Sequence, residues 1–219
     1  MAKSPIAHGI FPRGELRVIF ARDANSVHDA LATSTAATPG TGTLDRAAMP
    51  VSPFAPMKKL LIIHHSVTGG TLQMAQAAAA GARREPGVTV RLEAAAASGP
   101  QALLEADGYL FASPENLAAM SGLMKDFFDR TYYPVLDRIQ GRPYAILVCA
   151  GSDGTNAARQ IERIATGWRL RPIAPPLIVC THAQTPEAIL APKRIGAAEL
   201  ARCEELGATL AAGLSLGIF

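Results

Sequence analysis

Residues 60–75 read LLIIHHSVTGGTLQMA, and this stretch decides the fold. The four branched apolar residues at 60–63 predict a strand that is buried on both faces. The Ser, Thr and Gly residues at 66–71 predict a tight turn, and the sequence after them has the composition of a helix. A buried strand that leads through a turn into a helix begins a β–α unit, so we expect an α/β protein.

The same alternation of strand and helix continues from Met57 to the end of the chain. Short apolar runs at 109–112 (YLFA), 145–149 (AILVC) and 177–180 (LIVC) predict buried parallel strands, whereas the alternating VTVRLE at 88–93 predicts an edge strand. With right-handed crossovers, these five strands predict a three-layer sandwich around a parallel sheet in the order 2-1-3-4-5. Ligands bind such sheets beyond the carboxyl ends of the strands, at the switch point between strands 1 and 3. Function is therefore expected in the turns after strands 1, 3 and 4.

The first 56 residues differ from the rest of the chain. Residues 30–56 are rich in Ala, Thr, Pro and Gly and have no sustained helical or strand period. We expect residues 1–56 to be a disordered, linker-like extension or an upstream misreading of the start codon, and residues 57–219 to form the one folded domain.

Composition excludes several classes of partner. Apolar residues make up 49% of the 219 residues, and the formal net charge is only +3, so neither nucleic acid nor a membrane surface is an expected partner. No apolar run is long enough to span a bilayer. The three cysteines are far apart without a CxxC pair, which favours a reduced, cytoplasmic protein without a metal site.

The turn after the first strand has the composition of an anion site. Ser66, Thr68 and Thr71 supply hydroxyl groups, and two glycines let backbone amides approach a ligand. The N-terminus of the following helix adds unpaired N–H groups and a positive dipole end. The turn is neither a P-loop nor a GxGxxG motif, so a purely structural turn is the alternative.

The other two turns are rich in short polar residues. Ser121 is expected to cap the helix that begins near Gly122, and the segment before it could lie flat against a planar ligand. Asp153 or Thr155 could cap the helix after the fourth strand. His64 and His65 are adjacent in a strand and point to opposite faces, which favours a hydrogen-bonded pair at the strand end over a metal site.

Three segments together resemble the flavodoxin-like FMN proteins, in particular the NAD(P)H-dependent FMN reductases. SVTGGT (66–71) is similar to the S/T-x-T-G-N-T phosphate loop of the family, SPENLAAMSGLMKDFFDR (113–130) to its second flavin loop and the following helix, and AGSDGT (150–155) to its third flavin loop. The resemblance covers the chain from Met57 to the C-terminus. It implies a flavodoxin-like fold and FMN as the cofactor.

By position, the resemblance assigns residues of all three loops to the FMN site. The first loop would hold the phosphate, the second would lie along the isoalloxazine ring, and the third would lie at its pyrimidine edge. The residues concerned are Ser66, Val67, Thr68, Gly69, Gly70 and Thr71, then Pro114, Glu115, Asn116 and Leu117, and finally Ala150, Gly151, Ser152 and Asp153.

The implied activity is an NAD(P)H-dependent oxidoreductase that passes electrons from a nicotinamide through FMN to a quinone-like or other small acceptor. No side chain is expected to be catalytic, because a flavin brings its own reactivity. The three turns contain no Trp or Tyr, which favours a reductase with an open ring face over a flavodoxin-type electron carrier. Residues 116–119 depart from the family pattern, so an interaction protein that has lost FMN is a further alternative. The resemblance also implies a homo-oligomer, either a dimer or a tetramer.

Overall fold

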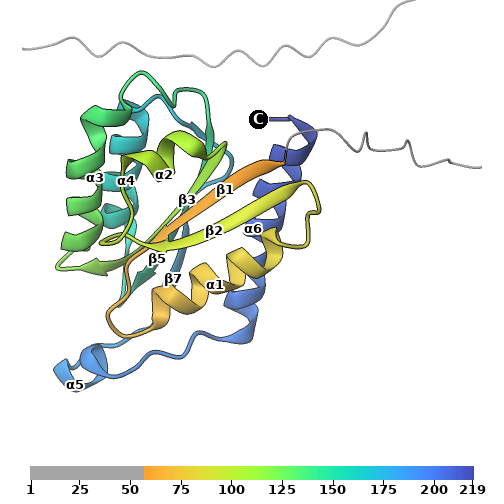
Figure 1. Ribbon diagram of the computed structural model, residues 1–219. Coiled ribbons are helices and arrows are strands. Elements are labelled where there is room, and N and C mark those ends of the chain that lie inside the picture. Colours follow the sequence, from red (N-terminus) through yellow and green to blue (C-terminus); the bar gives the residue numbers. More distant parts are fainter. Residues whose placement is uncertain (1–56) are drawn as a thin grey trace, which may run out of the picture. The chain divides into compact units, whose positions relative to one another are not determined.

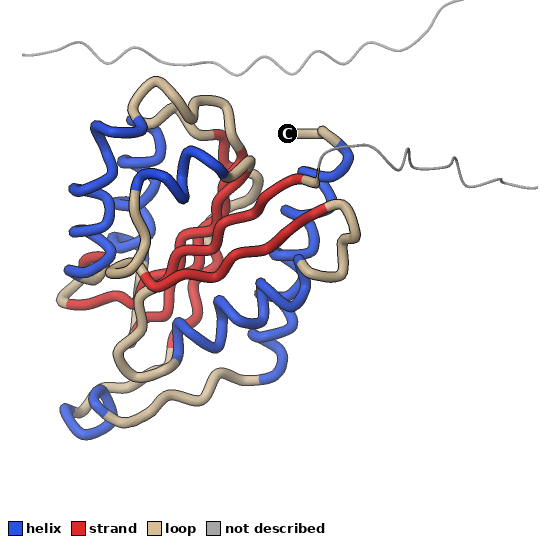
Figure 2. Tube along the Cα trace, viewed as in Figure 1, coloured by secondary structure: helices blue, strands red, loops and turns tan. Residues whose placement is uncertain are grey.

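The computed structural model describes residues 57–219, so the extension predicted over residues 1–56 lies outside the described residues. Strands and helices alternate along the described chain (Figures 1 and 2). Their bounds are β1 (Lys58–His64), α1 (Gly70–Ala82), β2 (Val88–Ala94), α2 (Pro100–Glu105), β3 (Gly108–Asn116), β4 (Ala119–Met120), α3 (Gly122–Val135), β5 (Pro143–Ala150), α4 (Thr155–Gly167), β6 (Arg171–Pro172), β7 (Leu177–Cys180), α5 (Pro186–Leu190) and α6 (Ala197–Leu216).

The five predicted strands are β1, β2, β3, β5 and β7, and they pair in the predicted order. β1 lies between β2 and β3, and β5 pairs in parallel with both β3 and β7. β2 is the edge strand that its alternating sequence predicts. Two short strands were not predicted: β6 adds two residues beside β5, and β4 pairs antiparallel with the end of β3 to form a hairpin.

Helices cover both faces of the sheet, as Figure 1 shows. On one face, α1 and α6 pack over the even-numbered side chains of β1, including Leu60 and Ile62. On the other face, α2, α3 and α4 pack over Leu61 and Ile63. Because the central strands are covered on both sides, all eight residues of β5 are buried. This explains the continuous apolar runs in the sequence.

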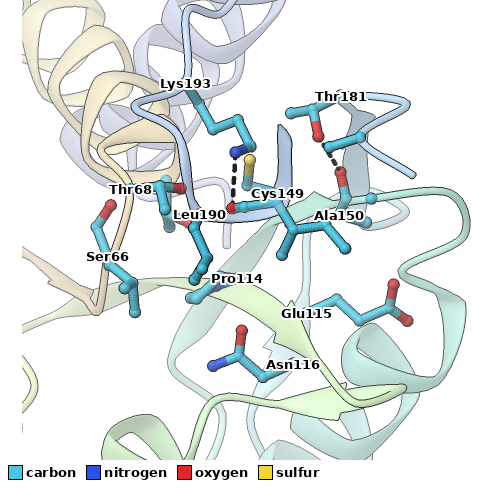
Figure 3. Close-up of a pocket in the computed structure, with 15 residues that line it drawn as sticks. Ser66, Thr68, Pro114, Glu115, Asn116, Cys149, Ala150, Thr181, Leu190 and Lys193 are labelled. Atoms are coloured by element: carbon cyan, nitrogen blue, oxygen red, sulfur yellow. Dashed lines mark hydrogen bonds between the residues drawn. The ribbon is translucent and has the colours of Figure 1, made fainter. Parts of the chain in front are cut away.

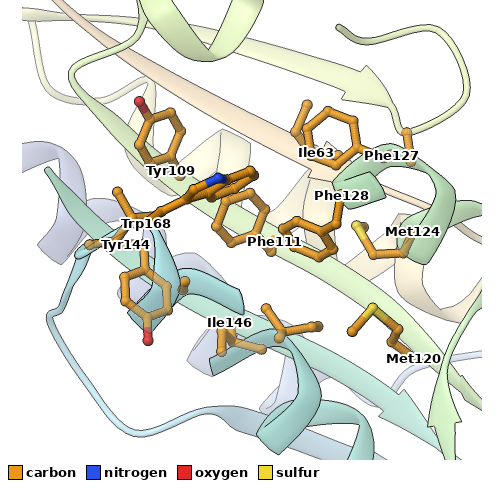
Figure 4. Close-up of a cluster of buried hydrophobic side chains, with 14 of the residues drawn as sticks. Ile63, Tyr109, Phe111, Met120, Met124, Phe127, Phe128, Tyr144, Ile146 and Trp168 are labelled. Atoms are coloured by element: carbon orange, nitrogen blue, oxygen red, sulfur yellow. The ribbon is translucent and has the colours of Figure 1, made fainter. Parts of the chain in front are cut away.

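The larger of the two hydrophobic clusters is centred on Phe111 of β3 (Figure 4). The ring of Phe111 lies 5.2 Å from that of Phe128 in α3 and 6.3 Å from that of Trp168 at the end of α4, and both contacts are tilted. Trp168 is almost completely buried, and its indole N–H donates to the carbonyl of Tyr132. Aromatic packing of this kind fixes α3 and α4 against the strands that lead to the second and third turns.

α1 and α6 approach each other closely at two glycines. A Cβ atom at Gly207 of α6 would overlap the backbone of Ala78 in α1, and one at Gly81 of α1 would overlap the backbone of Glu204 in α6. The alanine-rich sequence of α1 serves the same contact, since Ala75, Ala78 and Ala79 are fully buried. Within residues 57–219, no helix is both long enough and apolar enough to span a membrane.

We predict that Gly207→Ala destabilises the protein. The added methyl group meets backbone atoms that cannot rotate away, so the helices must separate at a cost of about 1–3 kcal/mol in the free energy of unfolding. Gly122→Ala is the matched control, because a Cβ atom there meets nothing within 4 Å and a helix favours alanine. Urea denaturation would measure both variants, and equal stabilities would contradict the close crossing of α1 and α6.

Candidate functional site

A cavity of about 240 Å³ lies beyond the carboxyl ends of β1, β3 and β5 (Figure 3). The loops that follow these three strands form most of its wall. The remaining wall comes from the connection between β7 and α6, residues 181–196, which we call the strap and which contains α5. The cavity therefore lies at the switch point where the sequence predicts a ligand.

The structure brings together residues from all three predicted loops. The predicted residues that line the cavity are Ser66, Val67, Thr68, Thr71, Pro114, Glu115, Asn116, Ala150 and Gly151. The other predicted residues do not line it. Gly69 and Gly70 form the beginning of α1 behind the cavity, Leu117 is fully exposed, and Ser152 and Asp153 are exposed in the third loop.

Several donors of the first loop have no hydrogen-bond partner within residues 57–219. Gly69 is the N-cap of α1 with a left-handed φ of 87°, and no side chain caps this helix end. The first-turn N–H groups of a helix have no partner within the helix, and the first turn of α1 contains no acidic residue. The hydroxyl of Ser66 is buried and also has no hydrogen-bond partner in the part of the chain that the structure describes. This donor set suits an anion.

Position 70 has no room for a side chain. A Cβ atom there would lie 2.7 Å from Sγ of Cys149 in β5 and 3.3 Å from Cβ of Lys193 in the strap. Glycine at 70 therefore lets the first turn of α1 pack directly against β5 and the strap. Glycine is favoured at position 69 for a different reason, since the backbone there adopts a left-handed conformation as the chain enters the helix.

The second loop is a hairpin, in which the end of β3 pairs antiparallel with β4. Ser113 and Ser121 join its base, because the N–H of Ser121 donates to Oγ of Ser113 at 3.0 Å. Oγ of Ser121 accepts from the N–H of Met124, which confirms the predicted helix cap. At the tip, Leu117 and Ala118 have φ angles of 49° and 58°. Turns with two such residues favour Asn-Gly, so this tip is conformationally strained.

The helix α4 holds the tip of this hairpin in place. Nδ2 of Asn156 donates to the carbonyl of Ala118 at 2.6 Å, and Oε1 of Gln160 accepts from the N–H of Met120 at 3.1 Å. The predicted cap of α4 was wrong. Its N-cap is Gly154 with a φ of 80°, and the hydroxyl of Thr155 donates to the carboxylate of Asp153 instead of either side chain capping the helix.

The strap contributes the part of the cavity that the motifs did not predict. It supplies Thr181, Ala183, Ile189, Leu190 and Lys193, and β5 adds Cys149. These residues belong to no sequence motif. The one feature of the sequence that could have indicated them is the long connection after the last strand, which exceeds the usual two to six residues. Its first residues follow β7, whose carboxyl end lies at the same edge of the sheet.

Hydrogen bonds attach the strap to the first and third loops. The N–H of Lys193 donates to the carbonyl of Thr68 at 2.8 Å, and the N–H of His182 donates to that of Gly151 at 2.8 Å. The side-chain amide of Gln73 in α1 donates to the carbonyl of Lys193 at 2.7 Å and accepts from the N–H of Ile195 at 3.2 Å. The strap is thus a fixed wall of the cavity.

The three cysteines are free thiols. Burial raises the pKa of the Cys149 thiol, and the nearby ammonium of Lys193 partly opposes this shift. Burial also raises the pKa of Cys203, to about 12. These thiols are therefore protonated at neutral pH and do not form a reactive thiolate at the cavity. Within residues 57–219, no three His, Cys, Asp or Glu side chains are grouped as metal ligands would be.

His64 and His65 were expected to form a hydrogen-bonded pair. This expectation was wrong, because the Nδ1 atom of neither imidazole forms such a bond with the described residues. Each Nδ1 is buried, and neither has a hydrogen-bond partner between Met57 and Phe219. Burial lowers the pKa of His64 below its usual value, and the neighbouring His65 lowers it further. Burial alone lowers the pKa of His65. Both imidazoles are therefore neutral at pH 7.

We predict that the cofactor-free protein loses stability as the pH falls below about 6.5, partly through these two histidines. The unfolded chain takes up protons at the ordinary histidine pKa, whereas the folded chain takes them up only at lower pH. The unfolded state therefore binds more protons in this range, so the free energy of unfolding decreases as the pH decreases. Urea denaturation of H64Q/H65Q between about pH 7.5 and 5.5 should show a shallower dependence. The exposed His182 supplies the control H182Q, and equal slopes in all three proteins would refute the prediction.

Comparisons with known proteins agree with this architecture. Residues 91–184 match the family model of NADPH-dependent FMN reductases. A flavodoxin of Aquifex aeolicus is 36% identical over 96 residues, which cover 44% of this chain and 50% of that protein. An NAD(P)H dehydrogenase (quinone) of Archaeoglobus fulgidus is 34% identical over 99 residues, covering 34% of this chain and 52% of that protein. The chain thus spans about half the length of the curated relatives it matches.

Solved structures show the same fold at lower sequence identity. A flavodoxin from the domain Archaea superimposes with a TM-score of 0.60 at 21% identity, covering 71% of this chain and 98% of that one. The WrbA-like flavodoxin of Agrobacterium tumefaciens gives a TM-score of 0.58 at 18% identity, covering 73% and 98%. The described part of the chain therefore has the flavodoxin-like fold, and in sequence it resembles NADPH-dependent FMN reductases and flavodoxins.

Proposed function

We propose that residues 57–219 form an FMN-binding domain and that FMN occupies the cavity at the switch point. The single observation that carries this proposal is the buried, unpartnered hydroxyl of Ser66 beside the uncapped N-terminus of α1. A buried polar group without a partner costs free energy, so a ligand that accepts its hydrogen bond explains why it is there. A phosphate monoester accepts from hydroxyls and helix N–H groups alike.

The first loop would hold the phosphate through Ser66, Thr68, Thr71 and the amides of Gly69 and Gly70. Pro114, Glu115 and Asn116 would lie along the ring, and Ala150 and Gly151 would lie at its pyrimidine edge. Apart from Gly69 and Gly70, which begin α1, these residues all line one cavity, which supports the assignment. Leu117, Ser152 and Asp153 would contact the cofactor only at its exposed rim.

The proposed activity is electron transfer from NAD(P)H to a quinone-like or other small acceptor. When bound, FMN would accept a hydride from a nicotinamide and release electrons to a second acceptor. The described residues that line the cavity include no aromatic side chain. One face of the ring would thus be open to a nicotinamide or a quinone, and the similarity to two proteins named NAD(P)H dehydrogenase (quinone) favours this reaction.

A flavodoxin-type electron carrier is the second candidate, and the Aquifex aeolicus flavodoxin favours it. An interaction protein that has lost FMN is a third, because residues 116–119 depart from the family pattern. We further propose a cytoplasmic location, in keeping with three free thiols, and a homo-oligomer.

The proposed function predicts that the purified chain binds FMN and oxidises NAD(P)H. Addition of FMN to cofactor-free protein should shift the flavin absorbance bands, and the complex should consume NADH or NADPH when a quinone is present. A loaded protein that oxidises neither nucleotide would favour the carrier. A protein that never takes up FMN would contradict the proposal and favour the interaction module.

Ser66→Ala should separate cofactor binding from stability. Removal of an unpaired buried hydroxyl should leave the free energy of unfolding unchanged or raise it by up to about 1 kcal/mol. The same change should raise the Kd of FMN about tenfold, because it removes a hydrogen bond to a charged group. Urea denaturation measures the free energy of unfolding, and titration with FMN measures the Kd.

Ser98→Ala is the matched control for this prediction. The hydroxyl of Ser98 is also buried without a partner, but it lies in the loop after β2 and does not line the cavity. Its loss should have a comparable effect on stability and none on the affinity for FMN. An unchanged FMN affinity in S66A would remove the main support for the phosphate site.

A further inference from the structure

Charge in the cavity is carried by two residues of opposite sign. Among the described residues that line it, Lys193 is the one cation and Glu115 the one acid. In Figure 3, Lys193 lies beside Cys149 above Thr68, and Glu115 lies on the other side of Pro114. The backbone of Lys193 bonds to Thr68, so this lysine belongs to the phosphate end of the cavity.

The side chain of Lys193 is held in a defined position. Its ammonium donates to three carbonyl oxygens at the end of α5, those of Ala188, Ile189 and Ala191, at 2.6, 2.8 and 2.7 Å. These acceptors are neutral, and within the described residues no carboxylate forms an ion pair with Lys193. The positive charge is therefore fixed in position beside the cavity, and no carboxylate of residues 57–219 neutralises it.

A bound phosphate monoester needs such a charge. It carries about −1.5 to −2 elementary charges at neutral pH, whereas a helix N-terminus offers the equivalent of only about +0.5. The first loop contains no Lys or Arg. Hydroxyls and amides can satisfy the phosphate oxygens, but they leave most of the charge unbalanced.

We propose that Lys193 is the residue that balances the charge of the cofactor phosphate, acting from the strap across the N-terminus of α1. This inference rests on the proposed function and extends it, because it assigns a cofactor-binding residue that lies far from the three loops in the sequence. Lys193 has a second role in the same arrangement, since its three hydrogen bonds fix α5, whose Ile189 and Leu190 line the cavity.

Comparison of FMN with riboflavin tests this assignment, because riboflavin has the same ring and ribityl chain but no phosphate. We expect Lys193→Met to raise the Kd of FMN about tenfold more than the Kd of riboflavin, because loss of the α5 contacts affects both ligands and loss of the charge affects FMN alone. Lys193→Arg should retain most of the FMN affinity. Arg194→Met is the matched control, since it removes an adjacent, exposed charge that does not line the cavity, and its Kd values should equal those of the wild type.

Fluorescence titration gives the affinities, and circular dichroism shows whether each variant is folded. Equal losses for FMN and riboflavin in K193M would mean that Lys193 only shapes the cavity wall, which would overturn the inference. Unchanged FMN binding in K193M, or an equal loss in R194M, would overturn it as well. None of these outcomes in the variants would contradict the proposed function, as long as the wild type binds FMN. A wild type that binds no FMN would overturn the proposed function and this inference together.

Discussion

The first turn of α1 lies so close to β5 and the strap that residue 70 can carry no side chain. This contact sets the positions of three parts of the cavity at once. Thr71 in the first turn of the helix and Cys149 in β5 both line the cavity, and Lys193 is held beside Thr68. One polar side chain secures the arrangement, because the amide of Gln73 bonds to Gly69, Lys193 and Ile195.

The rest of the fold supplies a rigid base for this edge of the sheet. Strands covered on both faces cannot shift without opening the core, and the aromatic cluster around Phe111 fixes α3 and α4 beneath the second and third loops. The base of the second loop is rigid for the same reason, since Ser113 and Ser121 are fully buried and bonded to each other. In contrast, its tip is exposed and strained at Leu117 and Ala118. Strain of this kind persists where the surrounding structure enforces it, here through Asn156 and Gln160 of α4.

The cavity combines preorganised donors with fixed charges. The Ser66 hydroxyl and the first-turn amides of α1 lie at one end without partners among the described residues, and Glu115 lies toward the other end (Figure 3). Unpaired buried donors lower the stability of the ligand-free protein. The same donors raise the affinity for a ligand, because little rearrangement is needed when it binds. The absence of aromatic residues among the described residues that line it leaves the affinity to polar contacts and to the aliphatic side chains of the strap.

The sequence by itself determined the strand order, the buried strands and the three loops, because hydrophobic period and turn composition act locally along the chain. It also predicted Ser121 as a helix cap, since that interaction spans only three residues. The tertiary structure alone decided the hairpin at 115–120, the glycine cap of α4 and the role of the strap. Lys193 lies 120 positions after Gln73, whose side chain bonds to its carbonyl, and no local pattern in the sequence records which residues meet across a folded sheet. The distinction is physical: secondary structure follows from neighbours in the chain, whereas a cavity follows from packing between elements that are distant in it.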